Sequence, residues 1–140
     1  MAVQAPNDTR KLLHVARIVL RWGDMDANAH VNNAAYFTYM EQARIDWLDA
    51  VGMQNTAQGE GPVVVKTSCT YLVPIAYPET LEVRVYGGAP GRTSFPTWYE
   101  IVGTERNVKY AEGDATMVWT NRTSGKSQPV PDALRTLLTG

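Results

Sequence analysis

One long stretch of helical periodicity stands near the start of this chain, and it limits the folds open to the rest. From Ala34 to about Val51, apolar residues recur at intervals of three and four positions, which predicts a helix. Asn32 or Asn33 is a natural N-cap for that helix, and Gly52 is the residue type that commonly follows a helix end. The rest of the fold must therefore pack against this one long helix.

Segments typical of strands flank this helix. One is expected before it, over residues 12–21, and four after it, over residues 62–73, 79–88, 93–103 and 107–121, with a polar loop over 53–61 and a short helix over 131–138. Pro96, inside the third of these four, suggests a sheet edge or a bulge. We expect an α+β domain spanning residues 1–140, with residues 1–10 frayed and one helix against an antiparallel sheet of about five strands. Such a thin domain leaves a sheet face and edges uncovered, which favours a homodimer or homotetramer.

Composition excludes several classes of function. The formal net charge is −1 and the isoelectric point is near 6.1, so nucleic acid is not an expected partner. The chain has no apolar run of membrane-spanning length and no secretory pattern in MAVQAPNDTRK, which predicts a cytoplasmic protein. With only His14, His30 and a single cysteine, Cys69, we expect no metal site and no cofactor, and we interpret Cys69 as an inert buried thiol.

Polar side chains gather directly before the predicted helix, at Asp26, Asn28, His30, Asn32 and Asn33. A carboxylate upstream of a helix start places a base beside unpaired backbone N–H groups. Reactions that develop negative charge on an oxygen need both elements, so the pattern indicates carbonyl chemistry. The structural alternative is that the aspartate is a solvated loop residue and the asparagines only cap the helix.

The order of these residues resembles a known family. The segment RWGDMDANAHVNNAAYFTYMEQAR, the later TYLVPIAYPETLEV and the GRTSF turn are similar to the hot-dog-fold acyl-CoA thioesterases, in particular the 4-hydroxybenzoyl-CoA thioesterase branch. The resemblance runs from about Val15 to Asn121. It implies a long helix wrapped by a curved antiparallel sheet, with two chains forming one continuous sheet and active sites at their interface.

The resemblance also implies roles for particular residues. The catalytic aspartate of the family falls on Asp26, and the backbone N–H that polarises the thioester carbonyl falls on Asn33. Tyr36 matches an aromatic position on the helix. The turn that contains Arg92 and Ser94 resembles a segment that reaches the phosphates of coenzyme A, which makes Arg92 a candidate substrate-binding residue.

A second resemblance covers the loop alone. The run from Asp26 to Asn33, with Asn28 and His30 at alternate positions, is similar to the acyl-carrier-protein thioesterases of plants, in which the matching Asp, Asn and His are active-site residues. Those enzymes carry a Glu-Cys pair before a Gly-Arg turn, whereas this chain has Ala89 and Pro90 there. The difference argues against a cysteine mechanism and leaves Asp26 as the central group.

The sequence therefore predicts a homo-oligomeric hydrolase of acyl-CoA, or of acyl-carrier-protein, thioesters. Asp26 would act as general base or as nucleophile, Asn33 would supply the oxyanion N–H, and Asn28 and His30 would orient water and Asp26. Two alternatives remain open. One is a hot-dog hydratase or dehydratase that uses His30, and the other is a non-catalytic acyl-CoA-binding module.

Overall fold

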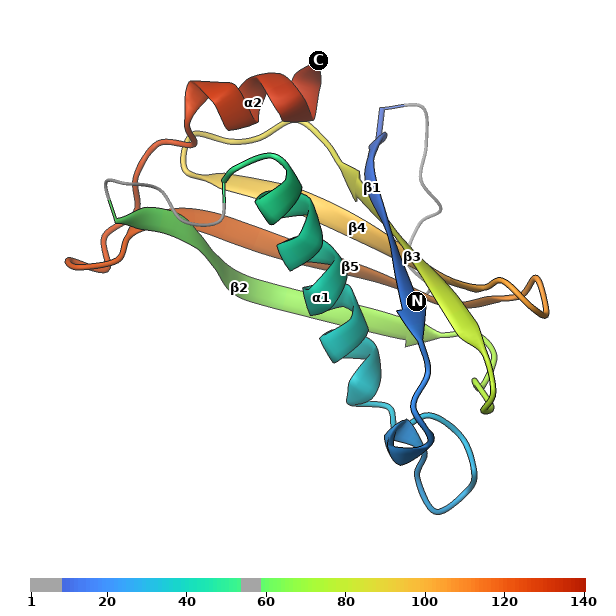
Figure 1. The fold of residues 1–140 in the computed structure, drawn as a ribbon. Helices are drawn as coiled ribbons and strands as arrows, with labels where there is room; N and C mark the ends of the chain where they lie inside the picture. The colour runs from blue at the N-terminus through green and yellow to red at the C-terminus, as the bar shows by residue number, and fades with distance from the viewer. Residues whose placement is uncertain (1–8, 54–58) are drawn as a thin grey trace.

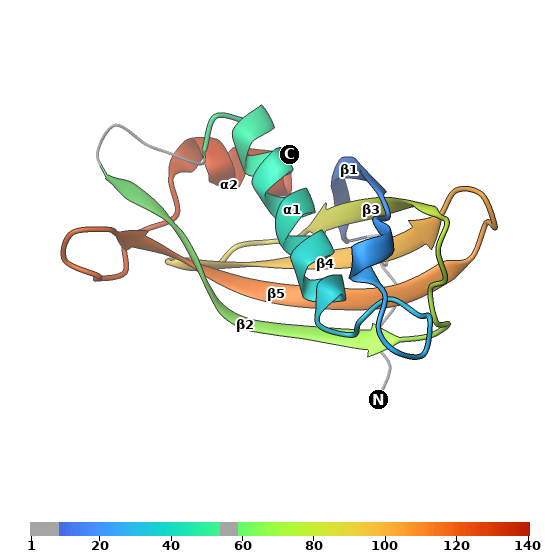
Figure 2. The same cartoon turned by 60° about the horizontal axis from the view of Figure 1, so that its bottom comes forward.

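The computed structural model describes residues 9–53 and 59–140. The predicted α+β architecture is confirmed: within the described residues, five antiparallel strands form one sheet in the order β1-β3-β4-β5-β2. The strands are β1 (Lys11–Val19), β2 (Glu60–Tyr71), β3 (Thr80–Gly87), β4 (Ser94–Gly103) and β5 (Lys109–Asn121). The sheet curves around one long helix, α1 (Ala35–Ala50), which lies along its concave face (Figures 1 and 2). In the described part of the chain, no helix is long and apolar enough to cross a membrane.

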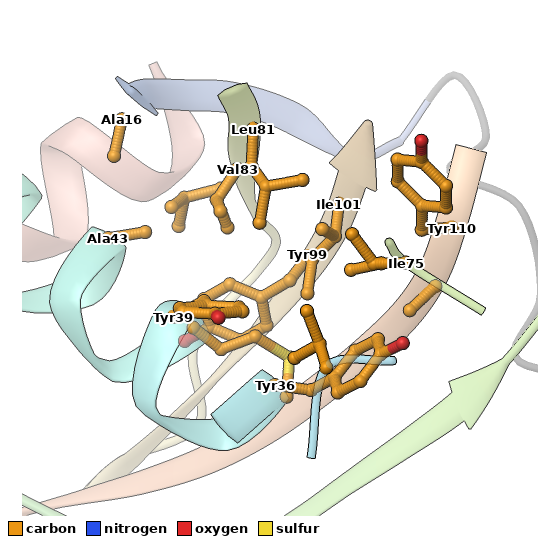
Figure 3. Close-up of a cluster of buried hydrophobic side chains, with 14 of the residues drawn as sticks. Ala16, Tyr36, Tyr39, Ala43, Ile75, Leu81, Val83, Tyr99, Ile101 and Tyr110 are labelled. Atoms are coloured by element: carbon orange, nitrogen blue, oxygen red, sulfur yellow. The ribbon is translucent and has the colours of Figure 1, made fainter. Parts of the chain in front are cut away.

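The core lies between α1 and the concave face of the sheet. Tyr36, Tyr39, Met40 and Ala43 from α1 pack in a cluster whose partners from the sheet include Leu81, Val83, Val85, Tyr99 and Ile101, all at most 1% exposed (Figure 3). The strands β3 and β4 alternate buried and half-buried residues along their length, so only one face of each packs against the helix. A second cluster, formed by Trp47, Phe95, Trp119 and their neighbours, brings in Leu134 and Leu138 from the short helix α2 (Asp132–Thr139).

The C-terminal end of α1 matches the sequence prediction in its chemistry. Gly52 has a φ of +73°, its N–H donates to the carbonyl of Asp49, and the N–H of Met53 donates to that of Leu48. This is the Schellman arrangement, which needs a left-handed residue that glycine adopts without steric cost. The predicted stop at Gly52 is therefore confirmed.

The predicted asparagine N-cap was wrong. The N-cap of α1 is Ala34, which makes no side-chain cap bond. Asn32 acts one step earlier: its side-chain oxygen accepts the N–H of Ala34 at 2.9 Å, and its carbonyl accepts that of Ala35. The asparagine thus closes a turn that leads into the helix, because an Asn side chain readily bonds the backbone two residues ahead.

The inference of a sheet edge at Pro96 holds only locally, since β4 as a whole lies inside the sheet between β3 and β5. Pro96 pairs with Thr116 of β5, while the pairing of β4 with β3 stops at Thr97. Pro96 therefore lies just beyond the end of β3, where its missing N–H leaves no partner strand unpaired. The strand expected from residue 62 begins at Glu60. Residues 1–8 of the N-terminus expected to be frayed, and residues 54–58 of the predicted polar loop, lie outside the described residues.

Candidate active site

A tight loop between β1 and α1 carries the polar cluster found in the sequence. The loop closes on itself through an isolated bridge between Met25 and Val31 and a bond of 2.7 Å from the Asp26 N–H to the His30 carbonyl. At its tip Ala29 has a φ of +61°, a conformation that a non-glycine residue adopts only where the surroundings hold it. The Val31 N–H donates to the carbonyl of Ile75 at 2.9 Å, so the loop is tied to a distant part of the chain.

The carboxylate of Asp26 is oriented by backbone donors. Its Oδ1 accepts the N–H of Asn28 at 2.8 Å and that of His30 at 3.3 Å. Its Oδ2 makes no hydrogen bond within the described residues and remains available to a ligand. The backbones of Asn28 and His30, rather than their side chains, therefore hold Asp26 in place.

The peptide that follows Asn33 is fixed at both ends. Its carbonyl oxygen accepts the hydroxyl of Tyr71 at 3.0 Å, and its N–H, on Ala34, donates to Asn32. The N–H of Asn33 itself has no partner among the described residues, and it stands at the start of α1, where the helix dipole favours negative charge. A backbone N–H without a protein partner is the kind of donor that can bind an oxyanion.

A pocket of about 330 Å³ brings these groups together, and its lining is Asp26, His30, Val31, Asn33, Tyr36, Tyr71, Leu72, Val73 and Pro74. The start of α1 and the end of β2 meet there, at one end of the sheet (Figures 1 and 2). Tyr36 is buried and meets the Tyr71 ring edge-on, with centroids 4.7 Å apart. Asn28 contributes its backbone N–H to Asp26 and is not part of the lining.

Asp24, two residues before Asp26, has a structural environment. It accepts hydrogen bonds from the Tyr39 hydroxyl at 2.9 Å and from Arg21 at 3.0 Å. Burial acts to raise the pKa of Asp24, but these bonds outweigh burial and hold the pKa below its ordinary value. The Asp24 carbonyl also accepts the N–H of Asn32, so Asp24 anchors the loop to α1.

Arg92 and Ser94 are not brought to this pocket within one chain. Ser94 pairs with Val118, which pairs with Val63 near the start of β2, whereas Tyr71 ends that strand. Eight residues of strand separate Val63 from Tyr71, which is roughly 26 Å. The carbonyl of Arg92 instead accepts the N–H of Val130, and this turn lies near α2 at the opposite end of the sheet (Figure 1).

The far wall of the pocket was missed from the sequence. Tyr71, Leu72 and Val73 are all more than 40% exposed; Tyr71 is the last residue of β2, and the other two follow it. The sequence shows only an apolar run before Pro74, and the exposure that marks it as a binding surface is visible in the structure alone. Their position opposite Asn33, however, depends on the strand register. The described residues contain no group of three or more His, Cys, Asp or Glu side chains that could hold a metal ion.

A curved antiparallel sheet around one long helix, with an aspartate loop before an open helix N-terminus, defines a hot-dog fold of the thioesterase type. The family model of the thioesterase-like superfamily matches residues 20–138. The chain therefore belongs to the thioesterase-like superfamily, and the predicted class of thioester hydrolase is confirmed at that level.

Solved structures and a curated relative agree with this assignment. The PA2801 protein of Pseudomonas aeruginosa, described provisionally as a thioesterase, is 40% identical, covers 90% of this chain and 98% of its own, and superposes with a TM-score of 0.84. A Xanthomonas campestris protein, described provisionally as an acyl-CoA thioesterase, is 31% identical over 86% of this chain and 100% of its own, with a TM-score of 0.74. The uncharacterised protein YsmA of Bacillus subtilis is 27% identical over 111 residues, which is 79% of this chain and 75% of that protein.

Proposed function

We propose that this enzyme hydrolyses acyl-CoA thioesters to a free acid and coenzyme A, with Asp26 as the reacting carboxylate. The observation that carries the proposal is one pocket lined both by Asp26, whose carboxylate is oriented by backbone donors, and by Asn33, whose N–H lacks a partner in the described residues. The description of the Xanthomonas neighbour as an acyl-CoA thioesterase supports the choice of substrate.

In the proposed reaction the thioester carbonyl oxygen accepts the N–H of Asn33. The Oδ2 atom of Asp26 takes a proton from water as the water oxygen attacks the carbonyl carbon. Negative charge then develops on the oxygen beside the start of α1, where the helix dipole and the N–H stabilise it. The carbon–sulfur bond breaks, and the thiolate of coenzyme A leaves with the electron pair and takes up a proton. Direct attack by Asp26 through a mixed anhydride gives the same products after hydrolysis.

His30 has a smaller proposed role. It is exposed at the mouth of the pocket, and its backbone, rather than its ring, contacts Asp26. A coenzyme A thiolate is a good leaving group, so an acid at this position is not required. We propose that the His30 ring orients water or the departing sulfur.

We further propose that the working unit is a homodimer or homotetramer. Asp26 is exposed in the single chain, and β2 is an edge strand with Val63, Val64 and Val65 exposed. Catalysis of this kind benefits from exclusion of bulk water, and an uncovered apolar edge strand favours association. Light scattering at micromolar concentration should show a species larger than the 15.5 kDa chain, and a pure monomer would refute the proposal.

A hydrolysis screen tests the proposed function. Acyl-CoAs from acetyl through long-chain and aromatic acyl groups are offered, free thiol is detected, and acyl-carrier-protein thioesters of the same acyl groups form a second arm. Release of thiol from at least one acyl-CoA is expected. Tight binding of acyl-CoA without thiol release would instead identify a binding module, and addition of water to an enoyl-CoA without thiol release would identify a hydratase.

A further inference from the structure

Arg44 is a buried cation on α1 that the proposed reaction does not use. Only 8% of it is exposed, and its guanidinium carbon lies 5.8 Å from the centre of the Tyr99 ring. Its Nη1 donates to the Tyr99 hydroxyl at 3.1 Å. Tyr99 projects from β4 towards α1 (Figure 3), so the charged group lies between the helix and the sheet.

The hydrogen bonds beyond Arg44 run in one direction. Arginine can only donate, so Tyr99 accepts from it and donates to Thr97 at 2.6 Å, and Thr97 donates to the carbonyl of Ala115 at 3.3 Å. Burial raises the pKa of Tyr99, which keeps its hydroxyl neutral. Among residues 9–53 and 59–140, no carboxylate lies within ion-pair distance of Arg44. A largely buried cation that has no ion-pair partner can bind an anion that enters beside it.

A second pocket, of about 350 Å³, opens beside this cation, and it is lined by Phe37, Thr38, Glu41, Arg44, Val64 and Thr67. In the described part of the chain, every fully buried side-chain nitrogen or oxygen has a hydrogen-bond partner. The nitrogens of Arg44 that make no such bond must therefore reach the surface, which at this position is the pocket. A planar guanidinium with unused N–H groups is suited to bind a carboxylate with two bonds.

This pocket and the candidate active-site pocket both lie along the contact between α1 and β2, which we call the seam. Asn33 and Tyr71 line the first pocket, and Arg44 and Thr67 line the second. Four residues of β2 separate Thr67 from Tyr71, which is about 13 Å along the strand. The eleven helix positions from Asn33 to Arg44 span about 16 Å, and the Arg44 side chain leans back towards the helix start. An extended acyl group whose carbonyl lies at Asn33 can therefore point along the seam towards Arg44.

We propose that Arg44 binds the terminal carboxylate of the acyl group, and that the enzyme prefers medium-chain ω-carboxyacyl-CoA thioesters. This inference rests on the proposed function, because it assumes that a thioester is bound at Asp26 and Asn33. The products are then a dicarboxylic acid and coenzyme A. The reactions that supply such a substrate are those that attach coenzyme A to one end of a dicarboxylic acid, or that shorten a longer one.

The depth of Arg44 favours a slender ligand over a second protein surface. A cation that pairs with another chain normally stands on the surface of its own chain, whereas Arg44 is already buried within this one. Glu41, one helical turn away, is exposed at the rim of the same pocket. Its negative charge weakens the binding of an incoming carboxylate, so the two residues should act in opposite directions.

The experiment compares acyl groups of equal length with and without the terminal carboxylate. The kcat/KM of suberyl-CoA is divided by that of octanoyl-CoA, and likewise for sebacyl- and decanoyl-CoA. In Arg44→Met this ratio should fall roughly ten- to a hundredfold, which corresponds to the free energy that a hydrogen bond to a charged group usually contributes. In Glu41→Gln the ratio should rise, and in Arg17→Met, which removes an exposed cation of β1, it should not move.

Binding and assembly are measured on the same variants. Calorimetry with non-hydrolysable thioethers of coenzyme A, one ω-carboxyalkyl and one alkyl, reports the preference even if no thioester is hydrolysed. That separates failure of this inference from failure of the proposed function. An unchanged ratio in both Arg44→Met and Arg44→Lys overturns the inference. A loss of the oligomer in both Arg44→Met and Glu41→Gln also overturns it, because Arg44 would then pair with the Glu41 carboxylate of a second copy rather than with a substrate.

Discussion

Replacing Asp26 with Asn tests the central residue of the proposed reaction with little disturbance of the loop. The Oδ1 atom of Asp26 accepts two backbone N–H groups, and the side-chain oxygen of Asn can accept the same two. The amide NH₂ then takes the place of Oδ2, the atom that makes no bond within the described residues. The loop should keep its shape, because the Asp26 and Ala29 backbone bonds are untouched. What is lost is the base and nucleophile.

The expected effect is large on turnover and small on binding. General-base catalysis contributes roughly 10²–10⁴-fold, so kcat in Asp26→Asn should fall at least about a hundredfold, which is roughly 2.7 kcal/mol of transition-state stabilisation. KM should change little, because the N–H of Asn33 and the apolar wall at Tyr71 remain. Steady-state thiol release on the best acyl-CoA of the screen measures both constants.

Asp24→Asn is the matched control. Asp24 accepts bonds from Tyr39 and Arg21 and does not line the pocket, so its loss should cost stability rather than chemistry. Its folded-state pKa is lowered, so the stability it contributes is present above its unfolded pKa of about 3.9. That contribution is lost as the pH falls through the folded pKa. If Asp26→Asn is as active as Asp24→Asn, Asp26 is a solvated loop residue. If Asp24→Asn loses turnover and Asp26→Asn does not, the roles have been assigned to the wrong aspartate.

Three further outcomes are expected. Tyr71→Phe removes the bond to the Asn33 carbonyl and should lower kcat about fivefold with KM unchanged, which corresponds to the loss of one neutral hydrogen bond. The control Tyr77→Phe, at an exposed side chain, should change neither constant. An equal effect of both variants would show that the Tyr71 hydroxyl does not hold the Asn33 peptide for catalysis. Burial raises the pKa of Cys69 to about 11, so iodoacetamide at neutral pH should leave activity intact, and rapid inactivation that tracks Cys69 labelling by mass spectrometry would contradict this. Prolonged EDTA treatment should leave thiol release unchanged, whereas a loss restored by a divalent ion would reveal a metal site.

The polar half of the candidate site can be predicted from the sequence because its residues are close together in the chain. Asp26 and Asn33 lie seven positions apart, and most of the bonds that shape the loop join residues close in sequence, the bond from Val31 to Ile75 being an exception. A motif of this kind can be recognised in the sequence as an ordered run of residues, and so can the helix end at Gly52. The N-cap was misplaced by one or two residues because both asparagines suit a helix start and only the backbone decides which one precedes it.

The opposite wall was not predictable from the sequence because it depends on register. Tyr71 meets Asn33 only through the way β2 is aligned on β5 and beside α1, and a shift of one residue would turn its ring away from the helix. The separation of Arg92 from the pocket has the same origin. The order of the elements places that turn after β3, but only the antiparallel pairing shows that it lies at the far end of the sheet.

The same division suggests how reaction and substrate choice are separated in this enzyme. Asp26 and the N–H of Asn33 are held by backbone bonds within the loop and by its tie to Ile75, none of which involves the later turns of α1. The groups that we propose to face an extended acyl chain line the pocket opposite β2, with Phe37 in the first turn of α1 and Arg44 more than two turns into the helix. A substitution along the seam can therefore change which acyl group fits while the aspartate and the oxyanion donor keep their geometry. Selectivity ratios between acyl groups, rather than turnover on any one of them, are the measurement that reports on this part of the molecule.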